Sequence, residues 1–259
     1  MTAAAHRPAT IGISLKMYMG YHQTTRWCER IAGIADEHPV LADGLARLFV
    51  LPSFPAIPRC VDIFAGRRVD VGAQDLFWED AGAFTGEVSG SMLSEMGCAY
   101  AEIGHAERRR IFGESDRIVA SKAVAALRNG LTPVVCVGEP KRTTAEQAAR
   151  SCIRDVNVVV DAAAAASMPA SMVVAYEPQW AIGAGEPAPV DHIQRVCRAI
   201  SGWLAGEPTA TGSRVVYGGS AGPGLLSRLG DAVDGLFLGR RAHDPAAVVS
   251  ILDEVSARP

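Results

Sequence analysis

The sequence lacks the patterns that would assign it to several large classes of protein. Its six cysteines include no Cys-x-x-Cys pair, so zinc-type spacing is absent, and a disulfide framework is not expected in a chain this long. The net charge of −3 does not favour a nucleic-acid or anionic membrane partner. No apolar run reaches membrane-spanning length. We therefore expect a cytoplasmic protein that binds no metal, nucleic acid or membrane.

What the sequence does have is the length and apolar content of one large domain. The chain has 259 residues, of which 49% are hydrophobic and 20% charged, as in an ordinary globular protein. No internal repeat and no break in composition marks a second domain. We expect residues 1–259 to form a single domain, with residues 1–8 as a flexible tail.

Short apolar runs alternate with amphipathic stretches along the chain. The runs are rich in Val, Ile, Leu or Ala, which is typical of strands buried on both faces of a parallel sheet. The expected strands are residues 10–15, 48–51, 69–73, 100–103, 133–137, 172–176, 214–217 and 235–238. The expected helices are residues 23–35, 55–64, 91–96, 116–128, 144–166, 190–204, 222–229 and 245–255. The pattern fits an α/β fold, either a closed TIM (β/α)₈ barrel or a doubly wound open sheet.

Polar residues follow five of the expected strands at the point where each strand ends. They are Lys16, His105, Glu177, the run Gly218-Gly219-Ser220, and the pair Gly239-Arg240. In a barrel, the loops at the carboxyl ends of the strands carry the active site. The barrel interpretation therefore predicts that these residues meet on one face.

Three of these side chains suit a proton transfer. Glu177 follows a buried strand, and partial desolvation strengthens a carboxylate as a base. His105 precedes a helical turn whose backbone N–H groups would favour an uncharged imidazole. Lys16 is flanked by apolar residues, which suits a cavity that binds an anion. Taken singly, each also has a plainer structural interpretation, such as a Glu that ends a strand or a Lys that extends to the barrel mouth.

Glycines after the last strands predict a phosphate site. Gly218, Gly219 and Ser220 lead into an expected helix and offer backbone N–H donors, and Gly239 adds another. Barrels commonly hold phosphate at this position. Residues 178–187, directly after Glu177, have prolines at both ends and glycines near the tip, which suits either a lid that closes over substrate or an ordinary surface loop.

At these residues the chain resembles the triosephosphate isomerase family. The most specific match is Glu-Pro-Gln-Trp-Ala-Ile-Gly at residues 177–183. Matching stretches in family order are residues 15–17, 72–74, 82–87, 103–109, 136–139, 175–183, 217–220 and 234–239. The resemblance favours the barrel over the open sheet.

The resemblance implies roles for the polar residues. Glu177 is implied as the carboxylate that moves the proton, His105 as the neutral electrophile, and Lys16 as the cation that binds substrate; this family is itself the standard example of such a base and histidine. The implied phosphate contacts are Gly183, Ser220 and Gly239, and Gly218 and Gly219 are assigned to substrate binding from their place in the turn. The reaction interconverts small phosphorylated sugars and needs no cofactor.

The resemblance also implies a homodimer built on the segment 72–87. Leu76, Phe77 and Trp78 are expected near the tip of this loop, exposed in one chain and buried by a partner. Thr85 resembles the residue that extends towards the neighbouring active site. We expect the basic run that starts at Arg108 to pair with Glu87 or Glu107.

Several residues depart from the family pattern. Ser14 replaces an Asn beside Lys16, and Arg240 replaces the second Gly after the eighth strand; Ala106, Gln179 and Glu186 are further departures. The smaller Ser14 leaves space for one more hydroxymethyl group of a substrate. We assign Ser14 and Arg240 to substrate binding.

These departures resemble the tetrulose-phosphate isomerase branch of the family, which serves erythritol breakdown. The favoured substrate is L-erythrulose 1-phosphate, converted to D-erythrulose 4-phosphate. The alternatives are a glycolytic triosephosphate isomerase and a non-catalytic paralogue that binds a sugar phosphate.

Overall fold

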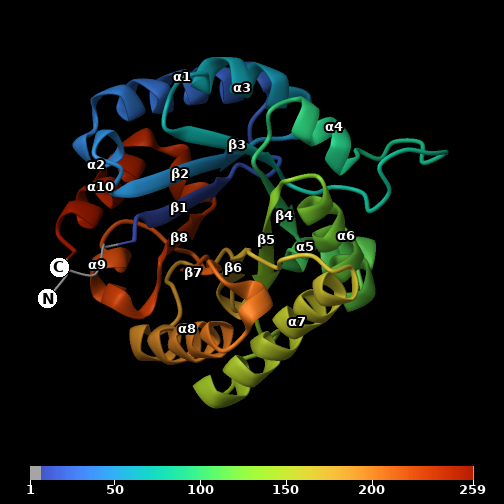
Figure 1. Cartoon of the computed structure of the whole chain (residues 1–259). Helices are drawn as coiled ribbons and strands as arrows, with labels where there is room; N and C mark the ends of the chain where they lie inside the picture. The colour runs from blue at the N-terminus through green and yellow to red at the C-terminus, as the bar shows by residue number, and fades with distance from the viewer. Residues whose placement is uncertain (1–6, 259) are drawn as a thin grey trace, which may run out of the picture.

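Eight parallel strands close into a barrel in the computed structural model, which describes residues 7–258 (Figure 1). The strands are β1 (Ala9–Ser14), β2 (Ala46–Leu51), β3 (Val69–Ala73), β4 (Tyr100–Ile103), β5 (Thr132–Val137), β6 (Val173–Tyr176), β7 (Arg214–Tyr217) and β8 (Gly235–Leu238). They follow one another in sequence order, and β1 pairs with both β2 and β8. This closure confirms the TIM barrel and rules out the doubly wound sheet.

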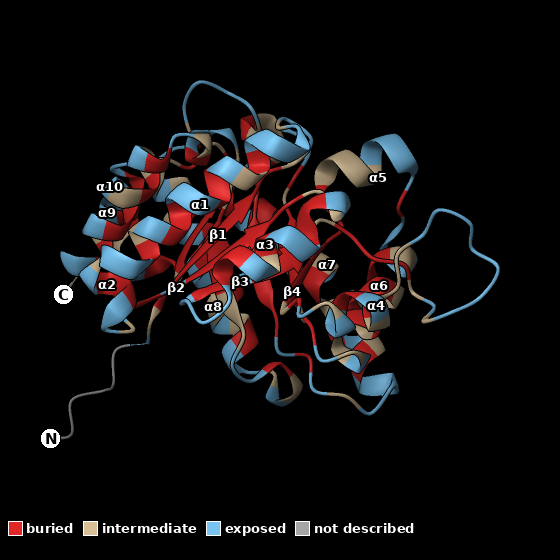
Figure 2. Ribbon diagram, turned by 90° about the horizontal axis from the view of Figure 1, so that it is seen from above, coloured by how far each residue is buried: buried red, intermediate tan, exposed pale blue. Residues whose placement is uncertain are grey.

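Helices surround the barrel and bury its outer face (Figure 2). They are α1 (Tyr21–Glu37), α2 (Pro39–Ala42), α3 (Ile57–Phe64), α4 (Gly90–Glu95), α5 (Ala106–Phe112), α6 (Asp116–Arg128), α7 (Ala145–Ala165), α8 (Val190–Ala205), α9 (Leu225–Leu229) and α10 (Pro245–Ser256). Short 3₁₀ segments, among them η2 (Gln179–Ala181) and η5 (Arg240–His243), lie in the loops. Figure 2 shows the strands buried along most of their length and the helices exposed along one side, as amphipathic segments require.

Apolar side chains fill the inside of the barrel. They form a cluster of Phe49, Leu51, Tyr100, Val134, Cys136, Val173, Ala175, Val216 and Phe237. On β1, residue 12 faces this cluster and has to be glycine. A Cβ at this position would lie 2.3 Å from the Phe49 ring. Side chains two residues apart on a strand share a face, so Ser14, Glu102 and Glu177 follow Gly12, Tyr100 and Ala175 on the inner face. These three polar residues therefore stand above an apolar floor.

The structure corrects several expected boundaries. The helix after β7 begins at Leu225 rather than residue 222, α2 was not expected, and α5 extends the helical turn that was expected after His105. The proposed tail lies mostly outside the described residues, which begin at Arg7. Within the described chain, no helix is long and apolar enough to cross a bilayer, and no group of three or more His, Cys, Asp or Glu is arranged to hold a metal. All six cysteines are buried and free.

Candidate active site

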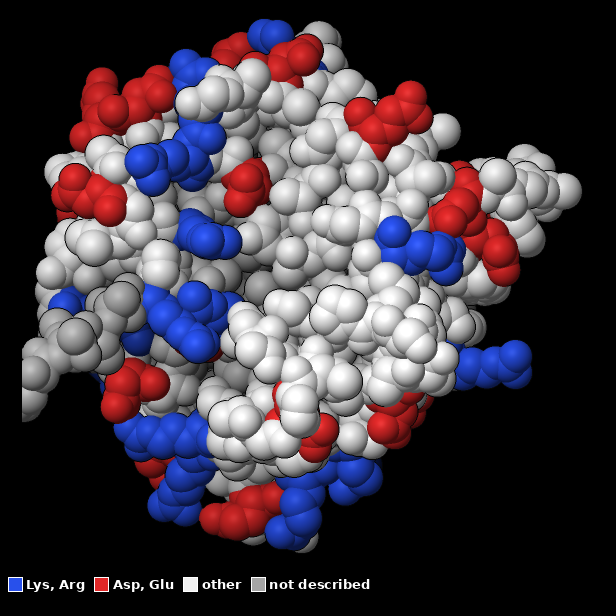
Figure 3. Space-filling model, viewed as in Figure 1, with Lys and Arg blue, Asp and Glu red and all other residues white. Residues whose placement is uncertain are grey.

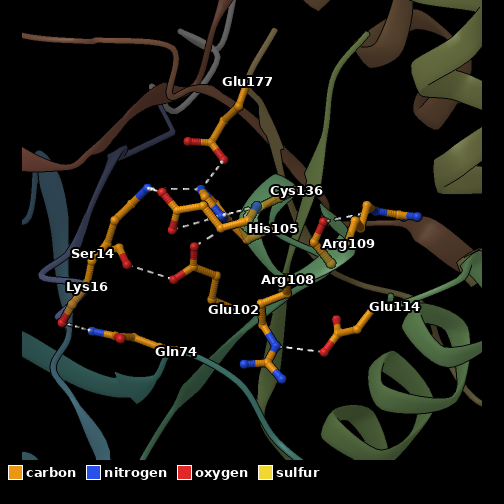
Figure 4. A network of polar contacts seen from close by, with 12 residues as sticks. Ser14, Lys16, Gln74, Glu102, His105, Arg108, Arg109, Glu114, Cys136 and Glu177 are labelled. Atoms are coloured by element: carbon orange, nitrogen blue, oxygen red, sulfur yellow. Dashed lines mark hydrogen bonds and ion pairs between the residues drawn. The ribbon is translucent and has the colours of Figure 1, made fainter. Parts of the chain in front are cut away.

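The polar residues after the strands meet at one cavity of about 560 Å³. Its walls include eight residues assigned from the sequence: Ser14, Lys16, Glu177, Gly183, Gly218, Ser220, Gly239 and Arg240. His105 lies against this group, with its Nε2 3.3 Å from the Lys16 amine and 3.5 Å from Glu177 Oε2 (Figure 4). A carboxylate, an imidazole and an ammonium thus converge beside glycine-rich backbone.

Lys16 is held in an unusual backbone conformation. Its φ of 49° is in the left-handed region, which disfavours side chains other than glycine. The Lys16 carbonyl accepts hydrogen bonds from Ser53 Oγ and Gln74 Nε2, both at 3.0 Å, and Gln74 also donates to the Leu51 carbonyl. These contacts hold the turn that directs the side chain into the cavity. Gln74 lies within a stretch that matches the family, yet sequence reasoning assigned it no role.

The Lys16 ammonium is kept charged by its surroundings. Burial alone would lower its pKa, but the hydrogen bond to Glu107 and the charges of Glu177 and Glu107 outweigh burial and raise the pKa. The Nζ–Oε1 distance to Glu107 is 2.7 Å. The same contact lowers the pKa of Glu107 against the opposing effect of burial. Glu107 is therefore the counterion that positions Lys16, a role that sequence reasoning missed.

His105 caps the start of α5, and this contact selects one tautomer of an uncharged ring. Its Nδ1 accepts a hydrogen bond from the Glu107 backbone N–H at 3.1 Å. A ring nitrogen that accepts carries no proton, so an uncharged ring has its hydrogen on Nε2. That hydrogen points into the space shared with Lys16 and Glu177. The ring is placed to donate to a substrate oxygen, as an electrophile must.

Glu177 is buried, with 7% of its surface exposed. Its Oε2 is enclosed and has no hydrogen-bond partner among the described residues. Its place on the inner face depends on Gly218, because a Cβ at that position would lie 2.5 Å from Glu177 Oε1. An unsolvated carboxylate oxygen without a partner is suited to take a proton from carbon.

The anion pocket differs from the sequence prediction in one respect. Because α9 begins at Leu225, the turn at residues 218–220 does not lead directly into a helix. The prediction of a helix N-terminus at this turn was therefore wrong. Gly183, Ser220 and Gly239 still line the cavity together with Lys16. Gly219 is not among the lining residues; its carbonyl accepts the Tyr217 hydroxyl at 2.7 Å. Loop backbone and Lys16 thus supply the donors for a phosphate.

The segment 178–187 lies over the cavity and is held there at several points. Trp180 Nε1 donates to buried Glu139 at 2.8 Å, and the Arg142 guanidinium lies 4.7 Å from the centre of the Trp180 ring. The Ser220 hydroxyl contacts the carbonyls of Ala181 and Ala184. At the far end, the Ala188 N–H donates to the Tyr217 hydroxyl. These contacts favour a lid over an ordinary surface loop.

Two consecutive arginines after β8 also reach the lid. Arg241 donates to the Gly185 carbonyl at 2.8 Å, and Arg240 reaches the Gly183 carbonyl at 3.5 Å. The Arg240 guanidinium also lies 5.7 Å from the centre of the Tyr18 ring. Arg240 was assigned to substrate binding from the sequence, and it does line the cavity. The lid contact of Arg241 had no sequence signal beyond its place next to that departure.

The loop between β3 and α4 projects from the body of the protein (Figures 1 and 2). Leu76 and Phe77 are buried within the single chain, and Phe77 stacks on Trp78 with ring centres 4.0 Å apart. The prediction that this cluster is exposed near the loop tip was therefore wrong: it packs at the base. Residues 81–87 are all exposed, and among them Phe84 has its ring centre 4.6 Å from that of Phe77.

Buried ion pairs hold the base of this loop. Lys122 Nζ lies 2.6 Å from both Asp75 and Glu114, and Arg108 contacts the same two carboxylates. The prediction that Arg108 pairs with Glu87 or Glu107 was wrong, because α5 turns its side chain towards the base of the loop. Such buried pairs restrict the direction in which the loop projects.

Comparison with known proteins adds to this geometry. The model of the triosephosphate isomerase family matches residues 9–255. The chain is 57% identical to an L-erythrulose-1-phosphate isomerase of Pectobacterium atrosepticum over 248 residues, which is 96% of each chain. It is 40% identical to a triosephosphate isomerase of Moorella thermoacetica over 90% of this chain and 94% of that protein. It is 37% identical to an L-erythrulose-1-phosphate isomerase of Rhizobium etli, over 95% and 92% respectively.

Proposed function

The chain belongs to the triosephosphate isomerase family, and from that premise we propose that it converts L-erythrulose 1-phosphate to D-erythrulose 4-phosphate. The observation that carries the reaction is the meeting of Glu177, His105 and Lys16 at one cavity lined by glycine backbone. Two observations support this choice of substrate. The small Ser14 lines the same cavity, and the chain is 57% identical to an L-erythrulose-1-phosphate isomerase.

The proposed reaction is a proton transfer between adjacent carbons. Glu177 removes the proton from C3 of the 1-phosphate, and the electron pair moves to the C2 carbonyl to form an enediolate. His105 donates from Nε2 to the developing oxyanion, and Lys16 offsets its charge. Glu177 returns the proton to C2 as the carbonyl forms at C3. Counted from the other end, the product is the 4-phosphate, and no oxidant or reductant is consumed.

The lid and the glycine loops hold the phosphate during this transfer. An enediolate next to a phosphate ester eliminates phosphate when the intermediate is free to rotate or to meet water. Contacts from Ser220 and Arg241 keep the lid over the cavity, which excludes water from the intermediate.

A kinetic comparison tests the substrate. We expect kcat/KM for L-erythrulose 1-phosphate to exceed that for dihydroxyacetone phosphate by at least about 10-fold, because a specific hydroxyl contact gives discrimination of this size or more. Both substrates are measured with the same enzyme preparation. Equal or faster turnover of the triose phosphate would instead support a glycolytic triosephosphate isomerase, the alternative favoured by the 40% identical relative.

A sensor that binds a sugar phosphate without turnover is the remaining alternative. Incorporation of deuterium from solvent into carbon-bound positions of the substrate distinguishes it, because only an enzyme exchanges these protons. The partnerless Oε2 of Glu177 argues for catalysis, since a protein that only binds has no use for a buried unsolvated base.

We also propose a homodimer in the cytoplasm. The tip of the projecting loop, residues 81–86, is free of charged side chains, as the right edge of Figure 3 shows. Its Phe84 is 42% exposed, and Met17, next to the catalytic lysine, is 91% exposed. Exposed apolar residues, such as Phe84 on the projecting loop and Met17 after β1, suit burial by a second copy of the chain. Free, buried cysteines fit a reducing compartment.

The variant Phe84→Asp tests the dimer. We expect it to shift the mass measured by light scattering from dimer to monomer, because an unpaired carboxylate would be buried in the interface. We expect kcat to fall by roughly 10²-fold if Thr85 completes the neighbouring site. Leu45→Asp, at an apolar residue of similar exposure, is the control and should stay dimeric. A wild-type protein that is monomeric at all concentrations contradicts the proposal.

A further inference from the structure

Glu102 is a buried carboxylate that the proton transfer does not use. It lies on β4, inside the barrel and directly below the catalytic group (Figure 4), with 3% of its surface exposed. The apolar cluster that includes Tyr100 and Phe49 lies beneath it. Burial of a carboxylate against such a floor opposes folding unless the charge or its hydrogen bonds are used. A leucine would fit this position more simply.

The strongest contact of Glu102 is with a residue of the cavity wall. Ser14 Oγ donates to Glu102 Oε2 at 2.7 Å, and the two residues are 88 apart in sequence. Among residues 7–258, the other oxygen, Oε1, accepts only a weak hydrogen bond from the Cys136 thiol, at 3.9 Å. Burial raises the pKa of Glu102 and the charge of Glu177 adds to the rise, while the hydrogen bond from Ser14 and the charge of Lys16 oppose it.

This hydrogen bond decides what Ser14 offers to the cavity. A hydroxyl has one proton to donate and two lone pairs that accept. Since the Ser14 proton points at Glu102, only lone pairs remain for the side of Ser14 that lines the cavity. Ser14 is thus an acceptor towards the substrate. An amide at the same position would present donors as well.

We propose that Glu102 is a positioning residue that sets Ser14 as the acceptor for the terminal hydroxyl of a four-carbon sugar phosphate. This inference rests on the proposed function. The terminal hydroxymethyl group is bonded to the reacting carbon on the side away from the phosphate. Phosphate bound at Gly183, Ser220 and Gly239 would direct this group away from the loop after β8. Ser14 follows β1, next to β8, but its Oγ extends across the barrel to Glu102 on β4, which lies opposite β8.

The pair discriminates against the three-carbon substrate in two ways. Dihydroxyacetone phosphate has no hydroxymethyl group at this carbon, so the Ser14 acceptor is left without its partner, and the space beside it is unfilled. A buried polar group left unpaired is the strongest device for rejecting a shorter substrate. The acceptor works only while Glu102 holds the Ser14 proton.

The test is the ratio of kcat/KM for L-erythrulose 1-phosphate to that for dihydroxyacetone phosphate. We expect Glu102→Leu to lower this ratio by about 10-fold or more, mainly through a higher KM for the tetrulose phosphate. Glu102→Gln should retain much of the ratio, because its amide carbonyl still accepts from Ser14. A change in the field around Lys16 and His105 would affect both substrates alike and would leave the ratio unchanged.

A double-mutant cycle isolates the route through Ser14. Ser14→Ala should lower the ratio by itself, and Glu102→Leu should have no further effect in the Ser14→Ala background. Val134→Ala is the control: Val134 pairs with Glu102 across the strands and belongs to the interior cluster, so it should lower thermal stability and leave the ratio unchanged. If Glu102→Leu does not fold, Ser14→Ala alone and with Glu102→Gln still reports the pair.

The outcomes separate this inference from the proposed function. The wild-type ratio decides the substrate: a value below one ends the proposed function. The change in ratio on mutation decides the role of Glu102, whatever the wild-type value. An unchanged ratio in Glu102→Leu and in Ser14→Ala overturns the inference even if the wild type prefers the tetrulose phosphate.

Discussion

Glu177→Gln is expected to lower kcat by roughly 10³- to 10⁴-fold, the largest loss of any single change in this protein. The amide has the same shape as the carboxylate but cannot take a proton from carbon. Because Gly218 leaves room for a side chain of this size, the variant should fold and bind substrate normally. The loss should therefore appear in kcat, with KM little changed.

Solvent deuterium exchange checks this expectation without a coupled assay. Wild type should incorporate deuterium into the substrate, and Glu177→Gln should incorporate it more slowly by the same roughly 10³- to 10⁴-fold. The matched control is Glu37→Gln, an exposed carboxylate at the end of α1, which should exchange as wild type does. Exchange at the wild-type rate in Glu177→Gln would mean that another group is the base.

Lys16→Met is expected to lower kcat/KM by about 10³-fold, since a cation beside developing charge contributes an effect of this order. The change leaves Glu102, Glu107 and Glu177 around the cavity with no ammonium among them. Like charges then oppose both the binding of an anionic substrate and the formation of an enediolate. We expect KM to rise and kcat to fall together, unlike the pattern for Glu177→Gln.

Steady-state kinetics with the tetrulose phosphate measures this effect. Lys141→Met, at an exposed lysine in the loop after β5, is the control and should retain wild-type kinetics. The rise in KM should shrink for a neutral substrate analogue without phosphate, because the lost interaction is with the anion. A kcat/KM for Lys16→Met within about 10-fold of wild type would contradict the role of Lys16 as the substrate cation.

Much of the fold could be predicted because each unit repeats the same local signals. Short apolar runs between turn residues are typical of strands buried in a parallel sheet. Four strands accordingly have the predicted bounds, at residues 69–73, 100–103, 214–217 and 235–238. The start of α9 was less predictable. Gly222 and Pro223 delay the helix to Leu225, and the apolar pattern alone does not show this delay.

The proposed catalytic residues could be found because a barrel brings every strand end to the same face. Lys16, His105 and Glu177 were identified by their place after a strand. In the structure, His105 Nε2 lies 3.3 Å from Lys16 Nζ and 3.5 Å from Glu177 Oε2. Their partners could not be found in this way. Gln74 and Glu107 act through hydrogen bonds whose geometry depends on how β3 and α5 sit against β1.

The loop between β3 and α4 shows the limit of reasoning from a resemblance in sequence. Leu76 and Phe77 were expected to be exposed because the segment resembles a dimer loop and they were placed near its tip. The buried pair of Lys122 with Asp75 fixes the loop base against α6, and the two apolar side chains are buried by that packing. Whether an apolar residue in a loop is exposed depends on the neighbours that the fold supplies, and these are distant in sequence.

By itself, the sequence determined the alternating strands and helices and the chemical groups that follow the strands, because both are visible in local periodicity. Periodicity left an open sheet as an alternative, and the resemblance to the family favoured the closed barrel. Only the tertiary structure decided which nitrogen of His105 carries the proton, which carboxylate faces Ser14, and which apolar side chains remain exposed. These properties depend on distances between residues far apart in the chain, and hydrogen bonding and desolvation change over fractions of an ångström that no sequence pattern records.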